Sequence, residues 1–197
     1  MENLKLKTER LELVAGTAEL FRVRVDDREF LRRRLGARVP DEWPPPLYDQ
    51  EALEWMAKYL DENPDAGAWT FYFIILAARD GAAASGTLIG GIGYKGKPSA
   101  DGTVEIGYSM LPEFQRAGYA TEAAGALIRQ AFSDPHVARV IAETYPELRP
   151  SIRVLEKNNF RFIGDGSEER VIRYALTREE YESEGNEVKP SIVNRES

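Results

Sequence analysis

The sequence contains no cysteine and only one histidine, His136, in 197 residues. Without cysteine the chain can form no disulfide framework and offers no thiol nucleophile. A single histidine also argues against a zinc site. A serine hydrolase would have to use His136, and the sequence has no Gly-x-Ser-x-Gly elbow to go with it. Because His136 follows Pro135 just before a predicted strand, we expect a surface turn residue there.

Long apolar runs and an excess of basic residues are also missing. The longest apolar run covers residues 71–78, which is far too short to span a bilayer, and residues 1–5 lack the apolar core of a signal peptide. We therefore expect a cytoplasmic protein without a membrane partner. The net charge of -7 argues against nucleic-acid binding, which needs a basic face. A phosphate-bearing ligand would have to find a locally basic patch.

The composition is that of a soluble globular protein, with 43% hydrophobic and 30% charged residues. The length suits one domain with a substantial core, which we place at residues 1–181. Residues 182–197 are polar and are expected to form a flexible tail.

Hydrophobic periodicity and turn residues predict an α/β fold of the α+β type. Strands are expected at 10–14, 69–79, 86–94, 103–111, 137–145, 160–164 and 170–176. Helices are expected at 17–36, 50–60, 118–132 and 150–158, and the proline-rich residues 40–46 must form a stiff loop. This order predicts a mixed, mostly antiparallel sheet of six to seven strands with about four helices packed on it.

The most informative stretch covers residues 104–124. It predicts a strand that stops at Pro112, a tight turn from Gln115 to Gly118, and an Ala-rich helix. Such a turn directs backbone N–H groups to the positive end of the helix dipole, which favours a bound phosphate. Gly118 has no Cβ, so an anion can approach its backbone closely.

The six residues from Gln115 to Ala120 fit the pattern Gln/Arg-x-x-Gly-x-Gly/Ala. This pattern resembles the pyrophosphate loop of the GNAT superfamily of acyl-CoA N-acyltransferases. Residues 150–160 are similar to a second motif, found in the branch that includes the ribosomal-protein N-terminal acetyltransferases, and residues 8–11 resemble the first strand of that branch. Two positions depart from the motif, because Leu148 replaces an asparagine and Asn159 replaces a glycine.

The resemblance implies a GNAT fold and an acetyl-CoA-dependent N-acetyltransferase that needs no metal. It places acetyl-CoA on the loop and the adjacent strand end, where a backbone N–H near Met110 or Leu111 would polarise the thioester carbonyl. Arg116 lies in the loop and is favoured for phosphate contact over the stripe formed by Arg149, Arg153 and Lys157. The expected coenzyme-binding residues are Met110, Leu111, Gln115, Arg116, Ala117, Gly118, Tyr119, Ala120, Thr121, Ser151 and Arg153.

Transfer of an acetyl group to an amine needs a base and a way to stabilise the departing thiolate. Glu105 and Glu143 match the base positions of two GNAT branches, although either could instead be a structural hydrogen-bond acceptor. Ser151 matches the serine near the coenzyme sulfur and is expected to protonate or stabilise the thiolate. The tyrosine that many relatives use as the acid falls at Leu155.

The acceptor is an amine, either a protein N-terminus or a small molecule. We expect Trp43, beside three prolines, and Trp55, on the following helix, to form a wall of its site; the alternative is that these side chains cover the sheet. Two other functions stay open, namely a catalytically silent acyl-CoA-binding module and an interaction module using the run Arg32-Arg33-Arg34. The oligomeric state is not predicted, and a homodimer is among the alternatives.

Overall fold

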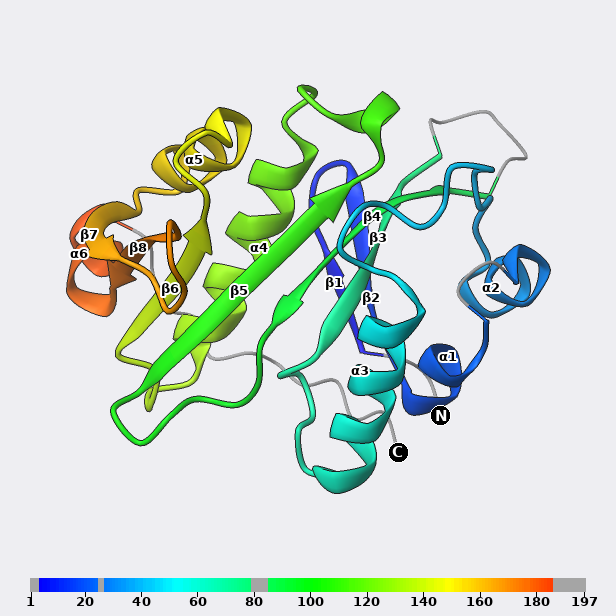
Figure 1. Cartoon of the computed structure of the whole chain (residues 1–197), viewed down its shortest axis with the longest axis horizontal. Helices are drawn as coiled ribbons and strands as arrows, with labels where there is room; N and C mark the ends of the chain where they lie inside the picture. The colour runs from blue at the N-terminus through cyan, green and yellow to red at the C-terminus, as the bar shows by residue number, and fades with distance from the viewer. Residues whose placement is uncertain (1–3, 25–26, 79–84, 186–197) are drawn as a thin grey trace.

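The computed structural model describes residues 4–24, 27–78 and 85–185. These residues build one eight-stranded sheet in the order β1-β2-β3-β4-β5-β6-β8-β7, with helices on both faces (Figure 1). Neighbouring strands are antiparallel except β5 and β6, which are parallel. The predicted mixed, mostly antiparallel sheet is therefore confirmed, and the strand count exceeds the expected six to seven.

The described residues form eight strands, six helices and one 3₁₀ turn. The strands are β1 (Lys5–Lys7), β2 (Leu11–Ala15), β3 (Phe71–Leu76), β4 (Thr87–Tyr94), β5 (Thr103–Met110), β6 (Arg139–Thr144), β7 (Arg161–Asp165) and β8 (Ile172–Thr177). The helices are α1 (Ala18–Arg22), α2 (Arg28–Leu35), α3 (Gln50–Glu62), α4 (Tyr119–Ser133), α5 (Arg149–Lys157) and α6 (Arg178–Ser183), with a 3₁₀ turn, η1, at Pro112–Phe114.

The predicted first helix, residues 17–36, is two helices. Thr17 caps α1 by accepting a hydrogen bond from the Leu20 N–H, but Val23 is extended and ends that helix after five residues. Asp27 caps α2, which ends at Gly36 in the left-handed conformation. Two capping side chains within ten positions favour two short helices over one long one.

Two short elements were not predicted. Strand β1 has three residues, too few for an alternating pattern to be visible. Helix α6 begins with a capping box between Thr177 and Glu180 and extends to Ser183, past the predicted boundary at 181. The Asp80-Gly81 pair, whose sequence favours a turn after the strand predicted at 69–79, and residues 186–197 of the expected tail lie outside the described residues.

Two hydrophobic cores lie on opposite faces of the sheet. Helices α4 and α5 cover one face, where Leu127, Phe132 and Leu155 pack against residues such as Ile106. Helices α1, α2 and α3 cover the other face over β2, β3 and β4 (Figure 1). The glycines of β4 permit this close packing, because a Cβ at Gly91 would meet the Phe71 ring at 2.3 Å. Among the helices that the structure describes, none covers β5 and β6 on the α3 side (Figure 1).

The arginine run of α2 forms a charged solvent-facing surface. Arg32 and Arg33 pair with Glu29, and Arg34 pairs with Glu19. These ion pairs account for the run as an ordinary solvated helix face.

The sheet splits between β5 and β6. The two strands pair only over Thr103–Glu105 and Arg139–Ile141. Beyond Glu105, β5 pairs only with β4, and beyond Ile141, β6 pairs only with β8. The two strands diverge from this point (Figure 1), so the carboxyl-terminal half of β5 has one edge without a partner strand.

Candidate functional site

The unpaired edge of β5 presents backbone donors to the split. Leu111 N donates to Ile89 O at 2.9 Å and Lys95 N donates to Glu105 O at 2.9 Å, so the odd-numbered residues of this strand bond to β4. Because backbone groups alternate in an antiparallel pair, the N–H groups of Tyr108 and Met110 point toward the split. Of the two predicted donors to a thioester carbonyl, Met110 is therefore available. The expectation for Leu111 is wrong, because its N–H already has an acceptor.

The predicted phosphate loop joins β5 to α4. Arg116 and Gly118 have φ angles of 62° and 83°, and Gly118 is the N-cap of α4 without a capping side chain. The first N–H groups of a helix have no acceptor within it, so those of Tyr119, Ala120 and Thr121 face outward. The loop is exposed and has the strand–turn–helix geometry that the sequence predicted, and its binding of phosphate stays a prediction.

The side chain of Gln115 braces the predicted loop. Its Nε2 donates to the carbonyl oxygen of Met110 at 3.1 Å. It therefore ties the loop to the end of β5, and the predicted coenzyme contact of Gln115 stays a prediction.

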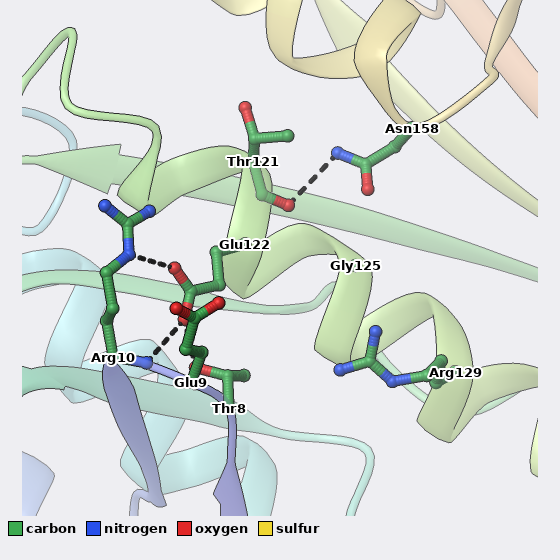
Figure 2. A pocket seen from close by; sticks show the side chains of 8 residues that line it. All are labelled: Thr8, Glu9, Arg10, Thr121, Glu122, Gly125, Arg129 and Asn158. Atoms are coloured by element: carbon green, nitrogen blue, oxygen red, sulfur yellow. Dashed lines mark hydrogen bonds and ion pairs between the residues drawn. The ribbon is translucent and has the colours of Figure 1, made fainter.

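An arginine from the β1–β2 turn also reaches the phosphate loop. Arg10 Nε donates to Glu122 at 2.7 Å and Arg10 Nη1 donates to the Ala117 carbonyl at 3.1 Å, with the guanidinium 4.6 Å from the centre of the Tyr119 ring. Thr8 Oγ1 donates to the same Glu122 carboxylate at 2.6 Å (Figure 2). Burial raises the pKa of Glu122, but the bonds from Thr8 and Arg10 outweigh it and leave this pKa below its ordinary value. This network holds the Arg10 guanidinium beside Gly118.

A polar cavity of about 500 Å³ lies next to this network (Figure 2). It runs from the β1–β2 turn along α4 to the end of α5, where Asn158 donates to the Thr121 carbonyl at 3.2 Å. Its lining residues are Thr8, Glu9, Arg10, Thr121, Glu122, Gly125, Arg129 and Asn158. The cavity is thus continuous with the amino-terminal turn of α4 and carries two arginines.

Glu105 lies at the vertex of the split, on the face of the sheet that α3 partly covers. Val104 and Ile106 point into the core beneath α4, so Glu105 and Gly107 point to the opposite face. The Glu105 carboxylate pairs with the Lys95 ammonium, and its buried Oε1 accepts no hydrogen bond of ordinary geometry from the described residues. A Cβ at Gly107 would meet no atom within 4 Å, so the sheet face beside Glu105 is open.

Glu143 is surrounded by donors. Its carboxylate accepts from Arg173 Nε at 2.8 Å, from Ser167 N at 2.9 Å and from Ser167 Oγ at 2.6 Å. Burial raises its pKa, but these bonds outweigh it and hold the pKa of Glu143 below the ordinary value. A carboxylate committed to this many donors is a poor base, so the structure favours Glu105 of the two predicted positions.

Ser151 lies in the first turn of α5 beside the phenol of Tyr108. The Tyr108 hydroxyl is 3.1 Å from the Ser151 carbonyl oxygen and 3.2 Å from Ser151 Oγ. Leu155 is buried in the core beneath the sheet, and Leu148 is exposed before α5. Arg153 is exposed and is not among the residues that line the cavity, so its predicted coenzyme contact stays a prediction.

The two predicted acceptor tryptophans have opposite environments. Trp43 is 3% exposed and its ring centroid lies 5.9 Å from that of Phe73, so its side chain covers the sheet, as the alternative interpretation held, and is buried away from an acceptor. Trp55 is 56% exposed and stacks on Tyr59 with 5.6 Å between ring centroids. Helix α3 lies on the same face of the sheet as the Glu105 side chain, and the Tyr59 hydroxyl accepts from the Lys97 N–H at 3.2 Å, just beyond β4. A role of Trp55 in acceptor binding stays a prediction.

Sequence reasoning missed Arg10 and Tyr108. Two signals could have found them. Arg10 is in the segment that resembles the first strand of the ribosomal-protein branch, and Tyr108 has the same parity in β5 as Val104 and Ile106, which predicts that it points beneath the sheet.

Three further expectations concern groups away from this site. His136 is exposed in a turn and pairs with Asp134 at 3.0 Å, which confirms the prediction for it. Within residues 4–24, 27–78 and 85–185 there is no cluster of three or more potential metal-ligating side chains. In the same ranges no helix has the length and apolarity to cross a membrane.

Comparison with known proteins agrees with this geometry. Residues 16–161 match the model of the acetyltransferase (GNAT) domain. The chain is 30% identical over 155 residues to YjdG of Bacillus subtilis, described as an uncharacterized N-acetyltransferase, a match that covers 79% of this chain and 88% of YjdG. It is 27% identical to the FsC-acetyl coenzyme A-N(2)-transacetylase of Aspergillus fumigatus, covering 89% of this chain and 77% of that one. The fold is also similar to RimL, a ribosomal L7/L12 α-N-protein acetyltransferase solved with coenzyme A, with a TM-score of 0.62, 17% identity and coverage of 90% and 99%.

The split sheet and its uncapped helix define an acetyltransferase of the GNAT fold. The chain belongs to the GNAT family and is an acetyl-CoA-dependent N-acetyltransferase.

Proposed function

We propose that the enzyme transfers the acetyl group of acetyl-CoA directly to a primary amine that enters over the open face of β5. The observation that carries this proposal is the position of Glu105 at the vertex of the β5–β6 split, beside Gly107, where an added Cβ would meet none of the described atoms within 4 Å. The Met110 N–H lies five residues beyond Glu105 on the same strand, roughly 16 Å away at ~3.3 Å per residue, so the carboxylate would act on an acceptor near that N–H through water. The acceptor is a protein N-terminus or a small amine.

The coenzyme is proposed to bind along the strand–turn–helix segment. The pantetheine arm follows the unpaired edge of β5, where the N–H groups of Tyr108 and Met110 point toward the split. The diphosphate lies on the N–H groups at the start of α4, next to the guanidinium groups of Arg10 and Arg116. The nucleotide end occupies the cavity beside α4, where Arg129 adds a second positive charge for phosphate.

The chemistry follows from these positions. Glu105 takes a proton from the acceptor ammonium through bridging water, so that the neutral amine can attack. The Met110 N–H stabilises the oxyanion that forms on the thioester carbonyl. Nitrogen bonds to the acetyl carbon, the C–S bond breaks, and coenzyme A leaves as a thiolate. With no cysteine in the chain, no thiol-linked acyl-enzyme can form.

The similarity searches leave both acceptor classes in the proposal. RimL is named as an acetyltransferase for a ribosomal-protein α-amine, and the Aspergillus relative is named as an acetylating enzyme for FsC. The exposed aromatic pair of Trp55 and Tyr59 favours an acceptor with an apolar or planar group next to its amine.

Release of free thiol from acetyl-CoA, measured with a panel of peptides and small amines, tests the proposal. At least one amine should give turnover, and Glu105→Gln should lower that turnover about 10²–10⁴-fold and change its pH profile. Acetyl-CoA affinity, measured by calorimetry, should stay nearly unchanged. Release of no thiol with any amine, despite coenzyme binding, would favour the silent acyl-CoA-binding module. If Glu143→Gln is severely impaired and Glu105→Gln is not, the base is on β6.

A further inference from the structure

One phenol connects the two halves of the split sheet. Tyr108 projects from β5 on the side of α4, and its hydroxyl reaches the first turn of α5, which follows β6. The hydroxyl lies almost equally far from two oxygens of Ser151, 3.1 Å from the carbonyl O and 3.2 Å from Oγ. The contact lies beyond Glu105, where β5 and β6 no longer pair.

Each hydroxyl in this contact has one proton, and this determines which atom donates. A carbonyl oxygen can only accept, so the single phenolic proton of Tyr108 serves the Ser151 carbonyl in this arrangement. The Ser151 hydroxyl then has to be the donor in the contact between Oγ and the phenol oxygen. The Ser151 proton is therefore held in one direction, and its oxygen is available to accept.

The near-equal distances allow this arrangement to change without movement of either side chain. If Ser151 turns its proton toward a developing negative charge in the split, the Tyr108 proton can turn from the carbonyl to Ser151 Oγ. The phenol then donates to the serine and the serine donates to the charge. Hydrogen bonds in such a chain strengthen one another.

We propose that Tyr108 is a positioning residue for thiolate departure, because it orients the Ser151 hydroxyl toward the sulfur of coenzyme A and strengthens that hydrogen bond. The inference rests on the proposed function. It also assigns a phenol to the leaving-group side of a site in which the position of the expected tyrosine is occupied by Leu155, a buried core residue.

The step is hydrogen-bond donation, with no proton lost from the enzyme's hydroxyls. Nitrogen bonds to the acetyl carbon, the C–S electron pair stays on sulfur, and the amine proton passes to Glu105. Burial raises the pKa of Tyr108 to about 12 despite its bond to Ser151. An alkyl thiol has a pKa near ~8.5, so the thiolate is too weak a base to remove a proton from this phenol. The sulfur takes its proton from water after release.

The test compares Tyr108→Phe with Ser151→Ala and the double variant in steady-state thiol release. Tyr108→Phe should lower kcat about 3- to 10-fold, the factor expected for one hydrogen bond between neutral groups, because the phenol acts on the charge only through Ser151. The KM for acetyl-CoA should change less than about threefold, since the hydrogen-bond contacts of the Tyr108 hydroxyl with the described residues are with Ser151. Because Tyr108 acts through Ser151, the double variant should be no slower than Ser151→Ala alone.

Tyr94→Phe is the matched control. Tyr94 lies on the neighbouring strand β4, and its hydroxyl donates to the Leu127 carbonyl of α4 at 2.6 Å, so its loss removes a comparable bond between strand and helix. It should lower the urea midpoint as much as Tyr108→Phe does while leaving kcat unchanged. A kcat within twofold of the unmodified enzyme in folded Tyr108→Phe would overturn the inference, as would additive losses in the double variant. Failure of the proposed function differs, since the unmodified enzyme would then release no thiol with any amine.

Discussion

The Glu143 carboxylate and the Arg173 guanidinium face each other across β6 and β8, with Oε1 2.6 Å from Nη2. Ser167, in the β7–β8 connection, donates to the same carboxylate through its backbone and its side chain. The carboxylate is 6% exposed. Glu143 therefore links the connection between β7 and β8 to strand β6.

Glu143→Gln is expected to destabilise the folded state by about 1–3 kcal/mol at pH 7, because a neutral amide leaves a charged donor unsatisfied. The folded-state pKa lies below the ordinary value of 4.5, so the carboxylate's contribution is complete above that value. It is lost as the pH falls through the lowered folded-state pKa. Urea unfolding of the unmodified protein and of Glu143→Gln should give a smaller difference in the free energy of unfolding in acid than at pH 7. A difference that is independent of pH would contradict this account.

Gly118→Asp should abolish measurable acetyl-CoA binding in a folded protein. Gly118 has a φ of 83°, and the substitution adds a negative charge where the diphosphate is expected. Asp tolerates positive φ better than most residues, so the fold should survive. Calorimetric titration with coenzyme A measures the loss. Gly36→Asp, at the end of α2, is the control because that glycine also has a positive φ, 63°, and lies in a helix cap away from the site. Unchanged affinity in Gly118→Asp would remove the loop from the binding site.

Trp43→Ala should lower the free energy of unfolding by about 3–5 kcal/mol, the usual cost of deleting a large buried aromatic side chain. Trp43 packs on Phe73 in the core beneath α1, α2 and α3. Trp43→Phe should cost less, since it keeps the ring and removes an indole N–H for which the described residues provide no acceptor. Denaturant unfolding compares the two. A raised KM for the amine with full stability would restore Trp43 to the acceptor site.

Trp55→Ala should change acceptor binding and leave stability nearly unchanged. Its side chain is largely exposed, so stability should change by less than about 0.5 kcal/mol. Loss of the aromatic face should raise the KM for the amine several-fold and leave the KM for acetyl-CoA unchanged. Phe162→Ala is the control, because Phe162 is similarly exposed but lies on the edge strand β7, at the far end of the sheet. Equal effects of the two variants on both constants would assign Trp55 no role in acceptor binding.

The parts of the fold that the sequence predicts well are those with long periodic patterns. Strands β3, β4 and β5 and helices α3 and α4 lie close to their expected ranges, because β3 is a continuous β-prone apolar run, β5 alternates, and the apolar residues of the helices recur over several turns. The break after Arg22 was not predictable from periodicity, since it depends on Val23 adopting an extended conformation between two capped helices. The loop at Gln115–Gly118 was predictable because its chemistry depends on the backbone and on one glycine.

The catalytic assignments depended on contacts that no local pattern encodes. Glu105 and Glu143 each match the base position of a different GNAT branch, and the donors around Glu143 distinguish them. Those donors come from Ser167 and Arg173, which are 24 and 30 residues away along the chain. Trp43 was misplaced for a related reason, because a proline-rich loop gives no sign of where its aromatic ring packs.

The hydrogen bond from Gln115 to Met110 determines which length of pantetheine arm fits the enzyme. This bond connects two parts of the proposed coenzyme site. One is the turn that is proposed to bind the diphosphate, and the other is Met110, whose N–H is proposed to bind the thioester. On that binding mode the two ends of the pantetheine arm are gripped by one short, internally braced piece of backbone. The distance between these two binding groups is therefore fixed. An acyl donor with a shorter or longer arm would still bind by its diphosphate, but its carbonyl would not reach the Met110 N–H.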